Sequence, residues 1–134
     1  AADGSYEMSW GGPGKEPGRF RLVHDVRIDK KERIWVSDRE NSRVQIFTKD
    51  GELLAVVSGN LMRIGAVWVD DQYAFIGELD GGVTILDMDL EVKAQLGCKG
   101  SVIHAHGITE DRNGNLYIFT NKKNENSILK LVHE

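Results

Sequence analysis

Short apolar runs alternate with polar turns along the whole chain. The runs are five to seven residues long, and the turns between them are rich in Asp, Gly, Asn and Lys. Such runs predict β-strands, and no stretch shows the 3.6-residue period of an amphipathic helix. Twelve strands are expected, at residues 5–10, 22–29, 33–38, 43–48, 52–58, 63–70, 72–78, 82–88, 91–97, 102–110, 115–121 and 127–133. The sequence therefore predicts an all-β fold.

The connecting segments carry signals of their own. Residues 11–20 form a loop rich in glycine and proline, which cannot hold regular structure. Asp-Gly and Asn-Gly pairs at residues 50–51 and 113–114 are typical of hairpin turns. In the turn after strand 33–38, we expect Asp38 to accept hydrogen bonds from turn amides and Asn41 to take a left-handed position.

The strand pattern repeats with a constant period. HDVRID begins at residue 24, GAVWVD at 65 and HGITED at 106, so both steps are 41 residues. The second strands follow in register, with IWVSD at 34, AFIGE at 74 and LYIFT at 116. The third strands are VQIF, VTIL and ILKL. A period near 40 residues with four short strands per unit is typical of the four-stranded blades of a β-propeller.

Three blades are predicted from this repeat, at about residues 20–60, 61–100 and 101–134. The third unit is one strand short, and residues 1–10 are expected to form the outer strand of a preceding or exchanged blade. Propellers close with four or more blades, so three blades correspond to half of a six-bladed ring. Either the chain is a segment of a longer ring, or two copies form a homodimer in which residues 5–10 complete the other copy's last blade.

Composition narrows the function classes. The chain has 134 residues with 40% hydrophobic and 28% charged residues, as expected for one modest globular domain. A net charge of -4 argues against general nucleic-acid binding. No apolar run approaches the ~18 residues of a membrane span, and the N-terminus lacks a signal-peptide pattern, so the compartment stays open. Cys98 has no disulfide partner in the chain and is expected to be a small buried apolar residue.

Two histidines occupy equivalent positions of the repeat. His24, Gly65 and His106 each open the innermost strand of a blade, and that strand lines the central channel of a propeller. His24 and His106 should therefore point toward one axis from blades two positions apart. Imidazoles that converge in this way suit zinc or another transition metal. The alternative is that each is an ordinary polar residue at the edge of a loop.

His104 is a rival ligand. It lies two residues before His106 on one face of the same strand, so the pair could also chelate a metal. The repeat favours His106, because the residue equivalent to His104 in the first blade is Leu22. His133, near the terminus, is expected to be solvated.

Arg39 is the third candidate site residue, after His24 and His106. It follows the second strand of the first blade, and its repeat equivalents are Leu79 and Asn121, so the repeat does not require arginine there. A guanidinium at this position could bind a carboxylate through two hydrogen bonds. The alternative is a surface ion pair with Asp38, Glu40 or a neighbouring blade.

The first unit resembles an NHL-type propeller repeat in WGGPGKEPGRF before the inner strand and in the pattern xVxDxxNxRxQxF after it. More narrowly, His24 followed by SDRENSRVQIF is similar to peptidyl-α-hydroxyglycine α-amidating lyase. AHGITEDRNGNLYIF resembles that family's segment around another zinc histidine, at His106. The resemblance implies a secreted six-bladed propeller with a zinc held by three histidines and a structural calcium.

Carried over residue by residue, the resemblance makes His24 and His106 two of three zinc ligands and Arg39 a substrate-binding catalytic residue. The implied reaction is a carbon–nitrogen lyase step, in which peptidyl-α-hydroxyglycine is cleaved to a peptide amide and glyoxylate. The third histidine belongs to a blade upstream of residue 1, so the site is incomplete in this chain. Gly107 stands where the family has an aspartate, which counts against calcium.

Two other functions stay open. One is a non-catalytic NHL module that presents a ring face, with a peptide or small-molecule ligand at the channel mouth. The other is a gluconolactonase-like hydrolase, whose metal-binding Glu, Asn and Asp set cannot be placed in this sequence.

Overall fold

The computed structural model of the protein describes residues 3–97, 103–122 and 125–133, and these residues form eleven β-strands in three antiparallel sheets. The strands are β1 (Val23–Ile28), β2 (Ile34–Asp38), β3 (Arg43–Phe47), β4 (Leu53–Val57), β5 (Ile64–Val69), β6 (Tyr73–Glu78), β7 (Gly82–Asp87), β8 (Val92–Leu96), β9 (Ala105–Glu110), β10 (Leu116–Lys122) and β11 (Glu125–Leu131). One short 3-10 helix, η1 (Arg39–Asn41), follows β2. The all-β prediction is confirmed.

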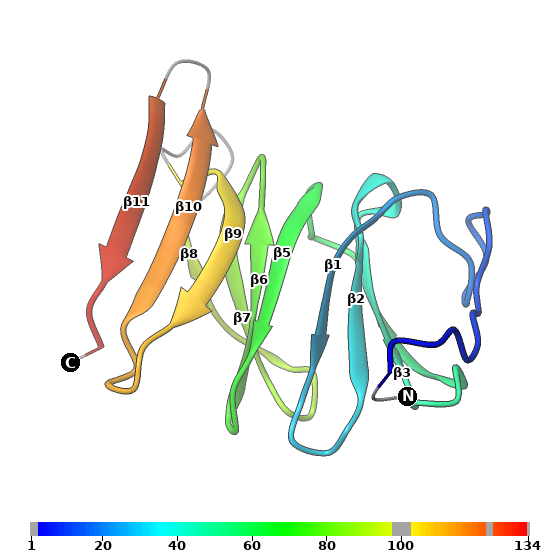
Figure 1. The fold of residues 1–134 in the computed structure, drawn as a ribbon. Helices are drawn as coiled ribbons and strands as arrows, with labels where there is room; N and C mark the ends of the chain where they lie inside the picture. The colour runs from blue at the N-terminus through cyan, green and yellow to red at the C-terminus, as the bar shows by residue number, and fades with distance from the viewer. Residues whose placement is uncertain (1–2, 98–102, 123–124, 134) are drawn as a thin grey trace.

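Each sheet is a meander in which consecutive strands pair in chain order. Strands β1 to β4 form the first sheet, β5 to β8 the second, and β9 to β11 the third. The first strands lie side by side, because β1 contacts β5 and β5 contacts β9 (Figure 1). The three sheets therefore share an inner edge and fan outward from it.

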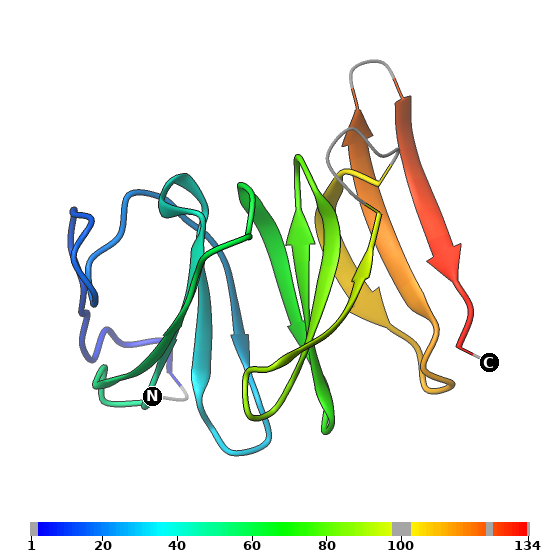
Figure 2. The ribbon, with the colours of Figure 1, turned by 180° about the vertical axis from the view of Figure 1, so that it is seen from behind.

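The sheets stand side by side as consecutive blades, which we call blades 1, 2 and 3 (β1–β4, β5–β8 and β9–β11). Seen from both sides, the chain ends lie at opposite ends of the array, with the N-terminal segment beside blade 1 and β11 beyond blade 2 (Figures 1 and 2). Four-stranded antiparallel blades stacked in this way are the units of a β-propeller.

Two apolar clusters hold the blades together, one at each interface, because a blade cannot bury both of its faces alone. Between blades 1 and 2 the buried members are Trp35, Val44, Ile46, Leu61, Ile64, Val67, Ala74, Ile76 and Leu86. Between blades 2 and 3 they are Ala66, Phe75, Val83, Ala105, Ile108, Leu116 and Ile118. Each blade thus offers one face to its predecessor and the opposite face to its successor.

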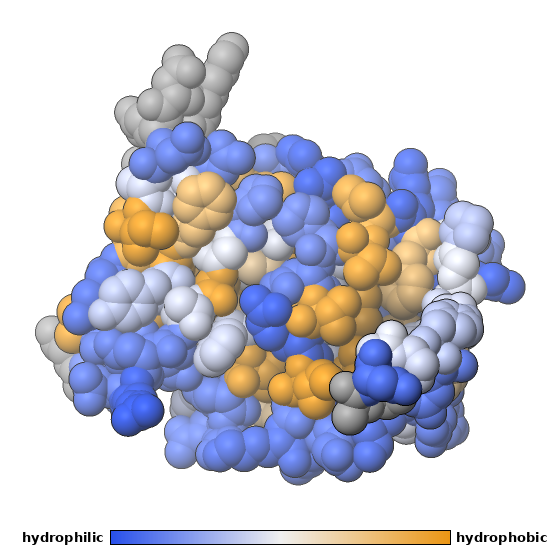
Figure 3. Space-filling view, in the orientation of Figure 1, coloured by the Kyte–Doolittle hydropathy of each residue, from blue (hydrophilic) through white to orange (hydrophobic). Residues whose placement is uncertain are grey.

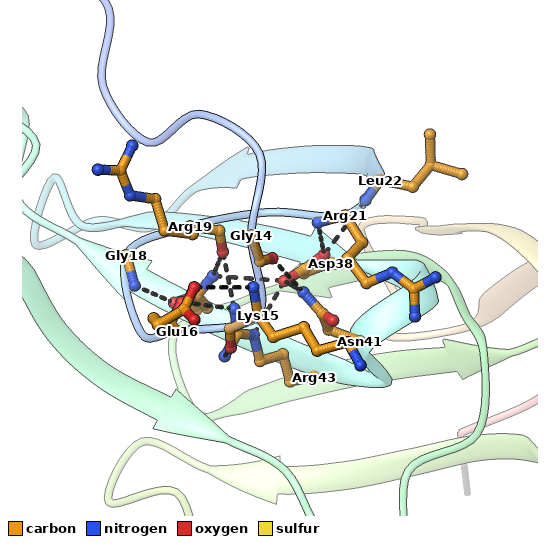
Figure 4. Close-up of polar contacts among 11 residues, drawn as sticks. Gly14, Lys15, Glu16, Gly18, Arg19, Arg21, Leu22, Asp38, Asn41 and Arg43 are labelled. Atoms are coloured by element: carbon orange, nitrogen blue, oxygen red, sulfur yellow. Dashed lines mark hydrogen bonds and ion pairs between the residues drawn. The ribbon is translucent and has the colours of Figure 1, made fainter.

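A buried polar network anchors the long loop that leads into β1. One carboxylate oxygen of Asp38 accepts hydrogen bonds from the backbone amides of Arg21 and Leu22, at 2.9 and 3.3 Å. The other oxygen accepts from Asn41 Nδ2 at 2.7 Å and from Arg43 Nε at 2.9 Å (Figure 4). Asp38 does accept backbone amides, but they belong to the loop before β1 and not to its own turn.

Arg43 and Gln45 extend this network over the same loop. The two terminal nitrogens of Arg43 donate to the carbonyl oxygens of Lys15, Glu16 and Arg19 at 2.7 to 2.9 Å. Gln45 Nε2 donates to the Arg19 carbonyl at 2.7 Å. The D-x-x-N-x-R-x-Q pattern of the first repeat thus has a structural role. Its side chains bind the loop before β1 and fix the path of the chain into that strand.

Two local features differ from the expectations. Residues 5–10 pair with no strand of this chain. The left-handed position after η1 is taken by Ser42, with φ 48° and ψ 49°, and not by Asn41. Asn41 is inside the 3-10 helix, where its side chain can reach Asp38. Cys98 lies outside the described residues.

Within the described part of the chain, no helix is long and apolar enough to cross a membrane.

Candidate functional site

His24 lies at the start of β1, on the side of blade 1 that faces blade 2. Its Nδ1 is 2.7 Å from the carbonyl oxygen of Gly65 on β5. A carbonyl oxygen can only accept, so Nδ1 carries the proton and donates it. The neutral ring then keeps a lone pair on Nε2. This is the arrangement of a metal-binding histidine, in which a backbone carbonyl fixes the tautomer and the ring orientation.

His106 meets His24 across blade 2. The two ring centroids are 4.9 Å apart, with the ring planes at 75°. Phe119 on β10 also packs against His106, with centroids 5.8 Å apart and ring planes at 71°. The structure therefore brings together the two histidines that the repeat placed at equivalent positions, and His106 contacts both an imidazole and a phenyl ring.

Gly65 explains how blades two positions apart can approach so closely. A Cβ atom at residue 65 would lie 2.5 Å from the carbonyl oxygen of Ala105 and 3.1 Å from the Cα atom of His106. No side chain fits there, because real Cβ atoms do not approach a backbone oxygen so closely. The missing side chain lets β9 close onto β5, and it leaves the Gly65 carbonyl free to orient His24.

The electrostatic surroundings of His106 favour its neutral form. Burial is the largest cause that lowers its pKa below the usual value of 6.5, and the positive forms of His24 and then Arg39 lower the pKa further. A hydrogen bond involving its own backbone works in the opposite direction. A neutral imidazole is the form that binds a metal ion, so this environment keeps His106 available as a ligand.

Arg39 opens η1 directly after β2, and its charge is close enough to act on His106. Its backbone amide donates to the carbonyl oxygen of Leu22 at 2.9 Å, which places it beside the start of β1. Its Nε forms an ion pair with Glu40 at 3.0 Å. That pair was one of the two roles the sequence left open. It uses only one of the five N–H groups of the guanidinium.

The rival histidine, His104, points to a different partner. Its Nδ1 donates to the carbonyl oxygen of Leu79, 2.5 Å away, directly after β6. The ring contact with His24 is made by His106 and not by His104. His133 is exposed, and its backbone amide donates to Asn115 Oδ1 at 3.2 Å.

The donors at this site fit part of a zinc shell. Two imidazoles from different strands are close together, one has its tautomer fixed, and the other is biased toward the neutral form. Among the described side chains, no group of three or more His, Cys, Asp or Glu lies close enough together to hold a metal ion. The described residues can thus contribute two protein ligands, and a complete zinc shell requires others.

The sequence did not reveal two residues that shape this site. Gly65 was visible only as the position where histidine is missing, and the close approach of β9 gives its reason. Phe119 belongs to an apolar run on β10, and nothing in that run distinguishes it. The sequence around Phe119 does not indicate that its ring will pack on a histidine of the neighbouring strand β9.

Comparison with known proteins agrees with this architecture. The family profile described as NHL repeat matches residues 20–47, which cover β1 to β3 and most of the Asp38 network. Human NHL repeat-containing protein 3 is 35% identical over 72 residues, which are 50% of this chain and 21% of that protein. The mouse protein of the same name matches equally. The chain thus matches about a fifth of the length of these curated relatives.

Solved structures with similar folds are large. Hydrazine synthase from Kuenenia stuttgartiensis matches 96% of this chain and 36% of its own, with a TM-score of 0.68 and 13% identity. A catalytically inactive virginiamycin B lyase from Staphylococcus aureus, solved with quinupristin, matches 83% of this chain and 41% of its own. Its TM-score is 0.62 at 11% identity. At such identities the likeness concerns the fold alone. Together the matches agree with a β-propeller segment in which residues 20–47 are similar to an NHL repeat.

Proposed function

We propose that the chain supplies part of a metal-dependent site at the channel of an NHL-type propeller, in which His24 and His106 bind zinc and Arg39 binds a carboxylate of the ligand. The observation that carries this proposal is the pair of imidazoles 4.9 Å apart, one of which is oriented through Nδ1 by the Gly65 carbonyl. Nε2 of His24 is the ligand nitrogen, because Nδ1 is already used.

Arg39 supports the choice of an anionic ligand. Its charge reaches His106, so a carboxylate bound to its free N–H groups would lie beside the histidine pair. Guanidinium groups bind carboxylates through two parallel hydrogen bonds with defined geometry. The ion pair with Glu40 on the partly exposed surface is weak enough to be replaced by a ligand.

The reaction that fits these residues is cleavage of a peptidyl-α-hydroxyglycine to a peptide amide and glyoxylate. Zinc would supply Lewis-acid activation of a substrate oxygen. Arg39 would hold the terminal carboxylate, and the lowered pKa of His106 would favour the neutral imidazole that binds the metal. The sequence resemblance supports this reaction, and the two neighbouring imidazoles fit part of its zinc site.

The first test is zinc binding by the 134-residue chain. Equilibrium dialysis should give one bound zinc ion per chain. The His24→Ala/His106→Ala double variant should lose this binding. His104→Ala is the matched control, because it removes a neighbouring histidine that the proposal does not use. Unchanged zinc content in the double variant would contradict the proposal, and so would loss of zinc in His104→Ala alone.

The second test separates the lyase from a non-catalytic ligand-binding module. The module is favoured by the described residues, which provide only two histidines at the site and no third ligand. A complete propeller ring that contains this chain, loaded with zinc, should release glyoxylate from a peptide that ends in α-hydroxyglycine, and Arg39→Ala should abolish the release. Binding of that peptide without release of glyoxylate would instead identify a binding module.

A further inference from the structure

Leu79 lies directly after β6, at the position of the repeat that Arg39 holds after β2. Its side chain lies over Gly65, since a Cβ atom at residue 65 would be 3.1 Å from Leu79 Cδ2 and equally far from the Cα atom of His106. Leu79 is half-buried and does not belong to either apolar cluster between the blades. A partly accessible apolar side chain therefore lies beside the backbone that carries His106.

The two equivalent residues bring two different chemistries to the site. Arg39, from blade 1, carries a charge that acts on His106, whereas Leu79, from blade 2, is aliphatic. On the face that bears β1, β5 and β9, polar and apolar patches lie next to one another (Figure 3). A ligand at the histidine pair would thus meet a cation and an apolar surface.

The turn that carries Leu79 is rich in glycine and needs anchors. Residues 79–82 read Leu-Asp-Gly-Gly, and Gly82 has a φ of +116°. Glycines give a turn many conformations of similar energy. Within blade 2, the amide of Leu79 donates to the carbonyl oxygen of Arg63 at 3.0 Å. The ion pair between Arg63 and Asp80 is long, at 3.5 Å, and exposed, so it adds little.

His104 supplies a second anchor from blade 3. Its Nδ1 donates to the carbonyl oxygen of Leu79 at 2.5 Å. The amide and the carbonyl of Leu79 are therefore both hydrogen-bonded, one within blade 2 and the other across the blade interface. The residue equivalent to His104 in blade 1 is Leu22, whose side chain cannot donate, so the repeat itself does not require this contact.

From these contacts we propose that Leu79 determines which ligands the channel site prefers, and that His104 is the residue that positions Leu79. The preferred ligand is a peptide whose C-terminal carboxylate binds Arg39 and whose preceding residue has an apolar side chain that packs on Leu79. The inference rests on the proposed function for the carboxylate end of the ligand, and it adds the class of the neighbouring side chain. His104 acts through Leu79 and does not touch the ligand.

The preference for an apolar side chain has a direct physical cause. A side chain that moves from water onto Leu79 removes apolar surface from solvent, which is favourable in proportion to the area covered. An acidic side chain at the same place would lose hydration without gaining a partner, which is unfavourable. One apolar group in a binding site changes affinity by about tenfold or more. The site should therefore prefer leucine to glycine before the C-terminal residue of the peptide.

Calorimetric titration with two unreactive peptides tests this preference. One peptide ends in leucyl-glycine and the other in glycyl-glycine, so both have the carboxylate and neither has the hydroxyl group at which cleavage would occur. A complete propeller ring that contains this chain, loaded with zinc, should bind the leucyl-glycine peptide about tenfold more tightly. Leu79→Ala should remove this preference and leave the affinity for the glycyl-glycine peptide unchanged. Val92→Ala, which removes an exposed valine of β8, should change neither affinity.

Arg39→Ala separates this inference from the proposed function, because it should weaken both peptides by the same factor. If neither peptide binds to the wild-type ring, the proposed function and the inference both fail. If Arg39→Ala weakens neither peptide, the proposed function alone is contradicted. If both peptides bind through Arg39 with equal affinity, or if Leu79→Ala keeps the preference, the inference is overturned and the proposed function stands.

Two substitutions of His104 test its positioning role. His104→Ala removes the donor to the Leu79 carbonyl and should lose the preference for leucyl-glycine while the zinc content stays unchanged. In His104→Asn, the side-chain amide nitrogen can donate in place of Nδ1, so this variant should regain the preference. A purely structural role would not be rescued so selectively. If His104→Ala keeps the preference, or if His104→Asn lacks it, His104 does not position Leu79.

Discussion

His24 and Gly65 occupy the same position in consecutive repeats, and the Nδ1–H of His24 donates to the carbonyl oxygen of Gly65 at 2.7 Å. One repeat thus uses this position for a polar ring, and the next uses it for a backbone acceptor without a side chain. The same glycine makes room for the strand that carries His106. The geometry of the site consequently depends on Gly65, which has no side chain, as much as on the two histidines.

Gly65→Ala should destabilise the fold and separate the two histidines. The new Cβ would lie 2.5 Å from the Ala105 carbonyl oxygen, so β9 must move away from β5. We expect a loss of about 1–3 kcal/mol in the free energy of unfolding, measured by urea denaturation. Gly107→Ala is the matched control, because its Cβ would lie 3.6 Å from Phe119 Cβ, an ordinary contact. If both variants are equally stable, the proposed close packing at residue 65 is wrong.

Asp38→Ala should be strongly destabilising. The substitution leaves Arg43 buried without its carboxylate partner and removes the acceptor of two loop amides. Breaking a buried ion pair from one side costs about 3–5 kcal/mol. Glu40→Ala removes the partly exposed partner of Arg39 and should change the free energy of unfolding by less than about 1 kcal/mol. Thermal unfolding of the two variants compares the buried Asp38 network with an ordinary surface ion pair. Similar losses of stability in both variants would refute the structural role of the D-x-x-N-x-R-x-Q pattern.

The turn between β9 and β10 should give a pH-dependent contribution to stability. The side-chain amide of Asn115 is the main cause that lowers the pKa of Asp111 to about 2. Loss of hydration opposes it, and the backbone amides of Asn115 and Asn113 and the Tyr117 hydroxyl assist it. Because the folded pKa is below the usual 3.8, the contribution is present above pH 4 and is lost as the pH falls toward 2.

The measurement is the difference in unfolding temperature between wild type and Asp111→Ala as a function of pH. This difference should be constant from pH 6 to about 4 and should shrink as the pH falls through about 2. A difference that stays unchanged across this interval would show that the ionised carboxylate does not stabilise the turn.

The pKa of His106 should depend on the charged residues beside it. Burial is the largest cause of its lowered pKa and remains in any surface variant, whereas the charges of His24 and Arg39 can be removed. NMR titration of the imidazole resonances should show the pKa of His106 rising toward 6.5 in His24→Ala and rising less in Arg39→Ala. His133→Ala, which removes an exposed histidine elsewhere, should leave the titration unchanged. A pKa of His106 that does not respond to His24→Ala would contradict the contact between the two rings.

Much of the fold followed from the sequence, because the strand pattern and the 41-residue repeat are local and periodic. The repeat also located His24 and His106 and gave the reason for choosing His106 over His104. Other features depended on tertiary contacts that a linear pattern does not contain. Residues 5–10 have a strand-like sequence but pair with no strand of this chain. The partner of Asp38 lies in a loop 17 residues away in sequence.

The most direct test of the proposed site is a titration of the chain with zinc, followed by nitrogen NMR of its histidine rings. Nε2 of His24 and one ring nitrogen of His106 should show the large shifts of metal-bound imidazole. Nδ1 of His24 should keep its proton and its hydrogen bond to Gly65. If zinc leaves both rings unchanged, or if it shifts only His104 or His133, the channel site does not bind metal and the account is contradicted.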